Sequence, residues 1–76
     1  MFIEIEDNLY LNPDKIVAVE LITVSSEPYG ETYQWVFFTD SPGEKSVFYG
    51  KMFDSIEDAV HWFDSIRYSI SKKNQL

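Results

Sequence analysis

The chain of 76 residues contains no cysteine, so it offers neither a disulfide nor a thiolate metal ligand. A reducing compartment is the simplest expectation. The opening segment Met1–Glu6 has acids within its apolar run and no basic residue, unlike a secretory signal peptide. No apolar run reaches the roughly 20 residues of a membrane-spanning helix. We therefore expect a cytoplasmic protein with no membrane segment.

Residues that commonly build catalytic or metal sites are also scarce. The three glycines lie far apart, which excludes a glycine-rich phosphate loop. His61 is the only histidine, and it shares a helical spacing with Glu57 and Asp64 that is more simply a polar helix face than a metal site. No serine or cysteine stands in a recognisable nucleophile motif. We predict no catalytic residue, no metal and no cofactor.

Basic residues are few: six Lys and Arg oppose thirteen Asp and Glu, for a net charge of −7. Residues 1–44 carry nine of the acids and a single base, Lys15, whereas residues 45–76 are nearly balanced. A negative field repels phosphate, which argues against direct nucleic-acid binding and favours a basic protein surface as partner. A solvated surface that keeps a small protein soluble accounts for the same charge.

The first third of the chain predicts a small hairpin. Phe2–Glu6 alternates apolar and acidic residues, as a half-buried strand does, and Asp7-Asn8 suits a tight turn. Leu9–Leu11 would return as a second strand. Pro13 has no N–H to give, so pairing should stop there.

Three longer strands are predicted next. Ile16–Val24 is apolar on both faces, which is typical of a central strand. Ser25–Gly30 reads as a loop, Glu31–Thr39 as an aromatic strand, Asp40–Glu44 as a turn and Lys45–Tyr49 as a returning strand. The chain therefore continues with the strand Ile16–Val24 and then a long β-hairpin.

The aromatic strand Glu31–Thr39 has two faces that both need cover. Alternation places Tyr33, Trp35 and Phe37 on one side, with Val36 and Phe38 on the other. The sequence does not decide which side a helix would cover.

A C-terminal helix is predicted after Ser55, which is well placed as its N-cap. One apolar helix face would pack on the sheet, with Trp62 at its border, and consists of Ile56, Ala59, Val60, Phe63, Ile66 and Ile70. We expect a single α+β domain over residues 1–71 and a frayed tail over residues 72–76. Its architecture would be an antiparallel sheet of four to five strands with one C-terminal helix packed on one face.

The segment Leu11–Ile16, followed by Val19 and Glu20, resembles small FlbD/SwrD-type flagellar accessory proteins in its Asn-Pro-Asp turn and Ile-rich strand. Similar short layouts occur in phage-encoded proteins. The resemblance covers about the first third of the chain plus the general layout, and it implies a small non-enzymatic accessory protein. No functional residue is carried over from it.

Two functions follow as hypotheses. The first is a non-enzymatic protein-binding module or regulator that acts through an aromatic sheet face, as a homodimer or docked on a larger protein. The second is an acidic inhibitor of phage anti-defence type, which mimics nucleic-acid charge and binds the basic groove of a nucleic-acid enzyme. The residues predicted to contact a partner are Tyr33, Trp35, Phe38, Phe48, Tyr49, Glu4, Glu6 and Glu31.

Overall fold

The computed structural model describes residues 2–28, 30–40 and 46–71, and it has the α+β class predicted from the sequence. Its elements in chain order are β1 (Ile3–Glu6), β2 (Leu9–Leu11), the 3-10 helix η1 (Pro13–Lys15), β3 (Ile16–Ser26), β4 (Gly30–Thr39), β5 (Val47–Phe53) and α1 (Ile56–Ser71). Among the described residues, no helix combines the length and apolar character needed to cross a membrane. Residues 41–44 of the predicted turn Asp40–Glu44 and the predicted tail over residues 72–76 lie outside the described residues.

The described strands form two antiparallel sheets. One contains three strands in the order β3-β4-β5, and the other is the β1-β2 hairpin. The expected single sheet of four to five strands is therefore not what the structure shows. The prediction that Ile16–Val24 forms a central strand is also wrong for the isolated chain, because β4 is central and β3 is an edge strand.

Local chemistry separates the β1-β2 hairpin from the larger sheet. The turn places Asn8 at a φ of 62°, a left-handed conformation that asparagine tolerates better than most residues. After Leu11, the side chain of Asn12 accepts a hydrogen bond from the N–H of Asp14 at 3.0 Å, and Pro13 begins η1. The hairpin therefore ends in a turn of 3-10 helix before β3 starts.

The hairpin packs against a face of the larger sheet. A Cβ placed on Gly50 would lie 3.2 Å from the carbonyl oxygen of Ile5, 3.3 Å from the ring of Phe37 and 3.3 Å from the carbonyl oxygen of Trp35. Only glycine allows the backbones of β1 and β5 to approach so closely. This contact sets the hairpin beneath β5.

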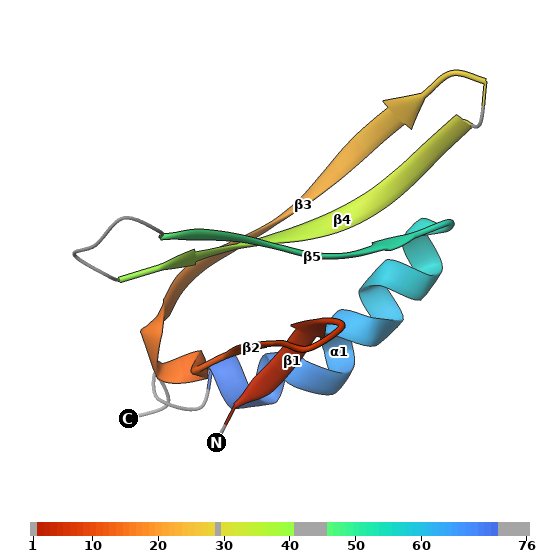
Figure 1. Ribbon diagram of the computed structural model, residues 1–76. Coiled ribbons are helices and arrows are strands. Elements are labelled where there is room, and N and C mark those ends of the chain that lie inside the picture. Colours follow the sequence, from red (N-terminus) through yellow and green to blue (C-terminus); the bar gives the residue numbers. More distant parts are fainter. Residues whose placement is uncertain (1, 29, 41–45, 72–76) are drawn as a thin grey trace.

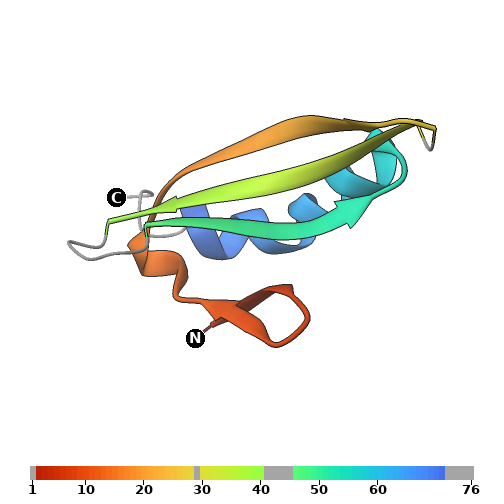
Figure 2. The ribbon, with the colours of Figure 1, turned by 45° about the horizontal axis from the view of Figure 1, so that its top comes forward.

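All the covering elements lie on one side of the three-stranded sheet. Figures 1 and 2 both show α1 and the β1-β2 hairpin on the same side. The core lies between them and the sheet, and Phe37 and Ile5 are fully buried in it. The buried residues of this cluster are Ile3, Ile5, Leu11, Ile16 and Phe37.

Helix α1 begins as predicted, because the hydroxyl of Ser55 accepts a hydrogen bond from the N–H of Asp58 at 3.1 Å. Its packed face is rotated from the predicted one. Ile56 and Val60 are exposed, whereas Trp62 packs against the core beside the fully buried Ala59. The strands also extend further than expected, since β3 runs through Ser26 into the predicted loop.

Replacing Gly50 by alanine should destabilise the fold. The added methyl group meets two backbone carbonyls and a buried ring at 3.2–3.3 Å, none of which can swing aside as a flexible side chain could. We expect the free energy of unfolding to fall by about 1 to 3 kcal/mol, the usual cost of overpacking. Urea denaturation followed by far-UV circular dichroism measures it. An unchanged midpoint would mean that β1 does not approach Gly50 as closely as described.

Candidate functional site: the uncovered sheet face

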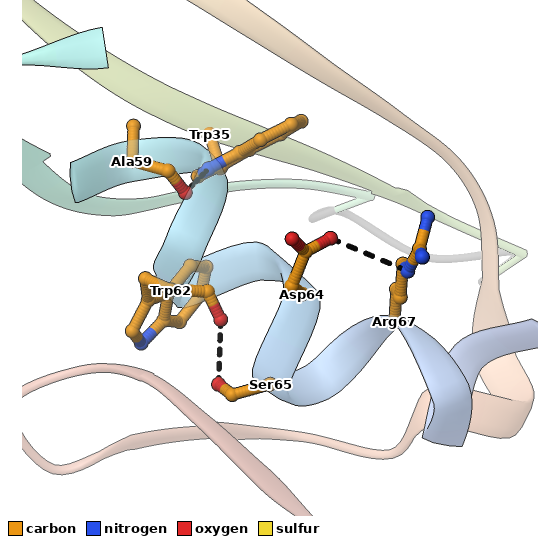
Figure 3. Close-up of polar contacts among 6 residues, drawn as sticks. All are labelled: Trp35, Ala59, Trp62, Asp64, Ser65 and Arg67. Carbon is orange, nitrogen blue, oxygen red and sulfur yellow. Dashed lines mark hydrogen bonds and ion pairs between the residues drawn. The ribbon is translucent and has the colours of Figure 1, made fainter. Parts of the chain in front are cut away.

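Trp35 decides which face of the sheet the helix covers. Its indole ring stacks on Phe63 of α1, with ring centroids 4.2 Å apart and an interplanar angle of 22°. Its Nε1 donates a hydrogen bond to the carbonyl oxygen of Ala59 at 2.9 Å, as Figure 3 shows. Trp35 of the central strand thus contacts the helix through the face of its ring and through its indole N–H.

Further aromatic contacts close the same face, which we call the covered face. Trp62 meets the ring of Phe37 edge-on at 6.3 Å and that of Phe53 at 5.7 Å. The ammonium group of Lys51 lies 5.3 Å from the Phe53 ring and 5.9 Å from the Trp62 ring, within the range of a cation–π contact. Aromatic side chains of both β4 and β5 therefore contact the helix on this face.

The opposite side of the sheet has no covering element among the described residues, as Figures 1 and 2 show. Cross-strand partners point to the same side, so the register of β3-β4-β5 assigns its members. We call this surface the open face. Its residues are Ala18, Glu20, Ile22 and Val24 of β3, Thr32, Gln34, Val36 and Phe38 of β4, and Val47, Tyr49 and Met52 of β5.

The open face is largely apolar. At its centre Val36 is only 4% exposed and Phe38 is half-buried. Towards β5, Tyr49 is 55% and Met52 52% exposed. Large apolar side chains are therefore presented to solvent around a closely packed centre.

Polar groups on the open face bond within the sheet. The amide nitrogen of Gln34 donates to the carbonyl oxygen of Gly50 at 2.8 Å, and the hydroxyl of Thr32 lies 3.4 Å from the carbonyl oxygen of Val24. Glu20 is the only charged residue that the register places there, although the chain as a whole carries −7. The open face is thus nearly neutral on a strongly acidic protein.

The structure divides the predicted partner-binding aromatics between the two faces. Phe38 and Tyr49 lie on the open face, as a partner contact requires. Tyr33, Trp35 and Phe48 lie on the covered face, and Trp35 and Phe48 pack against the core. The predicted set therefore spans both faces, because alternation alone does not show which face the helix takes.

Met52 belongs to the open face but was not predicted. A bulge in β5 sets two residues, Gly50 and Lys51, opposite the single residue Trp35. The extra residue shifts the alternation, so that Tyr49 and Met52 share a face although they are three residues apart. The glycine within the strand pattern is the one sequence signal that could have indicated the bulge.

The predicted acidic contacts lie on two separate parts of the fold. Glu4 and Glu6 are exposed on β1, where their carboxylates accept hydrogen bonds from the N–H groups of Asn8 at 3.0 Å and Asp7 at 2.9 Å. Glu31 is exposed near the start of β4. Glu4 and Glu6 therefore also stabilise the hairpin turn.

The remaining features of the described residues are a hollow, the lack of a metal-ligand group and an ion pair. An open hollow of about 360 Å³ at the tip of the β3-β4 hairpin is lined by serines, Pro28, Gly30 and the carboxylates of Glu27 and Glu31. No group of three or more potential metal ligands occurs in the part of the chain that the structure describes. On α1, Asp64 pairs with Arg67 at 3.3 Å on an exposed surface (Figure 3).

No family model, curated protein or solved structure matches this chain.

Replacing Trp35 by phenylalanine should loosen the helix without removing the stacked ring. The variant loses the hydrogen bond to Ala59 and part of the buried aromatic area, so we expect about 1 to 2 kcal/mol of destabilisation. Denaturation followed by circular dichroism measures the change. As a matched control, Tyr68→Phe alters an exposed ring of the same helix and should have no effect. Equal stability of the two variants would show that Trp35 does not hold the helix.

Proposed function

We propose that this protein is a non-enzymatic binding module that contacts another protein through its open face. The observation that carries the proposal is that both covering elements, α1 and the β1-β2 hairpin, lie on one side of the three-stranded sheet. The other side keeps exposed apolar residues within the described structure. A contiguous apolar patch on a small domain usually marks an interaction surface.

The composition of the open face supports a protein partner. Tyr49 and Met52 are exposed residues of types enriched at protein interfaces, and Phe38 lies on the same face, diagonal to Tyr49. Gln34 already donates its amide hydrogen bond within the sheet, so little polar surface would have to be desolvated on binding. A nucleic acid would need cations, and the register places none on this face.

Self-association through the open face is one form of this proposal. Two copies repel each other through their net charge of −7, and this repulsion is weakest where charged residues are fewest. The open face brings only Glu20 from each copy. A second copy is therefore an acceptable occupant of the face, alongside a larger protein with an apolar surface.

The acidic inhibitor remains a second candidate because the structure displays its charge fully. Among the described residues no charged side chain is buried, so every described acid can act on an approaching surface. A basic groove would be attracted by the acids of β1 and by Glu31. Since these acids come from separate parts of the fold, this candidate has less support than the open face.

Lysines introduced on the open face should abolish partner binding and leave the fold intact. Tyr49→Lys combined with Met52→Lys changes two exposed positions, and burying unpaired ammonium groups at an interface should weaken binding by over about 2 kcal/mol. The partner is first identified by photo-crosslinking from position 49 in cells that express the protein. Its affinity for each variant is then measured by calorimetry.

The control for this experiment is His61→Lys with Tyr68→Lys, which also introduces two lysines but on the exposed side of α1. It should keep full affinity. A partner that binds the open-face variant as tightly as the original protein would contradict the proposal.

Charge reversal tests the acidic inhibitor. If the acids hold a basic groove, Glu31→Lys should weaken binding, and the affinity of the unchanged protein should fall steeply between about 50 and 500 mM salt. Glu31 is the better site for reversal because it makes no contact with the hairpin turn, unlike Glu4 and Glu6. An affinity that does not change with salt would exclude this candidate.

A further inference from the structure

We infer that the outer edge of β3 is a second interaction site, where β3 pairs in antiparallel fashion with β3 of a second copy to form one continuous six-stranded sheet. The outer edge means the side of β3 that faces away from β4. This inference concerns a different surface from the open face and does not depend on the proposed function.

The outer edge is long, and no described strand pairs with it. β3 spans 11 residues, and among the described residues its only strand partner is β4. In an antiparallel ladder, alternate residues direct their N–H and C=O groups away from the partner strand. The outer edge therefore presents a row of backbone donors and acceptors that a further strand can use.

The two edge strands, β5 and β3, differ in the features that block pairing with a further strand. β5 carries a bulge at Gly50 and the basic residue Lys51, and Ile5 of β1 packs against it. Bulges, lysines and covering segments are the features by which proteins block an edge. β3 has a bulge only at its first residues, between Ile16 and Ala18, and contains no proline, lysine or glycine.

The side chains of β3 fit a central position. Ile22 and Val24 lie on the open face, while Val19 and Leu21 lie on the covered face, so both faces of the strand are apolar. Val17 is 63% exposed. Such a pattern is typical of a strand with a neighbour on each side, and in the single chain β3 has a neighbour on one side only.

A second copy supplies a strand that matches on both faces. Partners in an antiparallel pair point to the same side of the sheet, so a two-fold axis perpendicular to the sheet sets open-face residues opposite open-face residues and covered-face residues opposite covered-face residues. It also places both helices on one side and joins the two open faces on the other. The strand thereby complements itself in shape and in pattern.

The low charge of β3 also favours a second copy of the chain as its partner. Glu20 is the only charged residue in β3, although each copy carries −7 overall, so this strand is a place where two copies repel each other little. Registers centred on Leu21 or Ile22 set Glu20 opposite Ile22 or Val24 of the second copy. They avoid the direct opposition of two Glu20 carboxylates, which would be destabilising.

Hydrogen exchange of the unchanged protein tests the pairing directly. Sedimentation should show a dimer, and exchange read by nuclear magnetic resonance should show that the amides of alternate residues between Val17 and Val24 become protected as the protein concentration rises. Only an added strand produces this alternation. A protein that stays monomeric up to millimolar concentration, or β3 amides of which every second one exchanges freely in the dimer, would overturn the inference.

Lysine substitutions that block the edge of β3 provide the second test, and we call the protein that carries them the guard variant. Val17→Lys with Thr23→Lys changes two exposed positions of the edge strand and should weaken dimerisation at least tenfold, even though the lower net charge reduces repulsion. His61→Lys with Tyr68→Lys adds the same charge on the exposed side of α1 and should leave the dimer unchanged. If the guard variant does not fold, the exchange pattern of the unchanged protein decides alone.

The open-face variant Tyr49→Lys with Met52→Lys separates the two surfaces. A dimer that persists in this variant and is lost in the guard variant supports pairing at the outer edge. The reverse result, in which the open-face variant is monomeric and the guard variant is not, would overturn the inference and assign the dimer to the open face.

Discussion

The rest of the structure depends on the docking of α1 beneath Trp35. The indole ring lies on β4, stacks on Phe63 and bonds to the carbonyl of Ala59, so the helix is held under the centre of the sheet. A helix of 16 residues is about 24 Å long and about 10 Å wide, and it can cover one face of a small sheet only. Once Trp35 has selected that face, no helix of the described part of the chain covers the side of Val36 and Phe38. The β1-β2 hairpin packs on the same side of the sheet as the helix, because Gly50 has no side chain that would meet the backbone of β1.

Features encoded by neighbouring residues were predictable from the sequence. The Asn8 turn, the stop at Pro13 and the Ser55 cap each depend on a few adjacent atoms, and the structure has all three. The class and the order of most elements followed from such signals together with periodicity. The helix face was predicted less well, because its rotation is set by Trp35 and Trp62, which bring Ala59 to the sheet and leave Ile56 and Val60 exposed.

Features that depend on distant residues could not be predicted. The choice between the two faces of β4 depends on where a helix more than 20 residues later docks, and the packing of the β1-β2 hairpin on the larger sheet depends on the approach of Ile5 to Gly50. The bulge in β5 moved Met52 onto the open face by shifting the alternation by one residue. The two aromatic residues of the open face, Phe38 and Tyr49, are both among the residues predicted to contact a partner, whereas Met52 is not.

The sequence pattern of β3 does not match the position of this strand in the sheet. Ile16–Val24 has the pattern of a central strand, and β3 is an edge strand. Natural sequences are locally consistent with their final environment, so this conflict supports the inference that a second copy pairs with β3. The proposed partner would cover the open face from above, whereas the second copy would pair with β3 from the side. These directions are perpendicular, so one partner can lie on the sheet while a second copy extends it. For a domain this small, whose stability is expected to be marginal, either contact would also stabilise the fold itself.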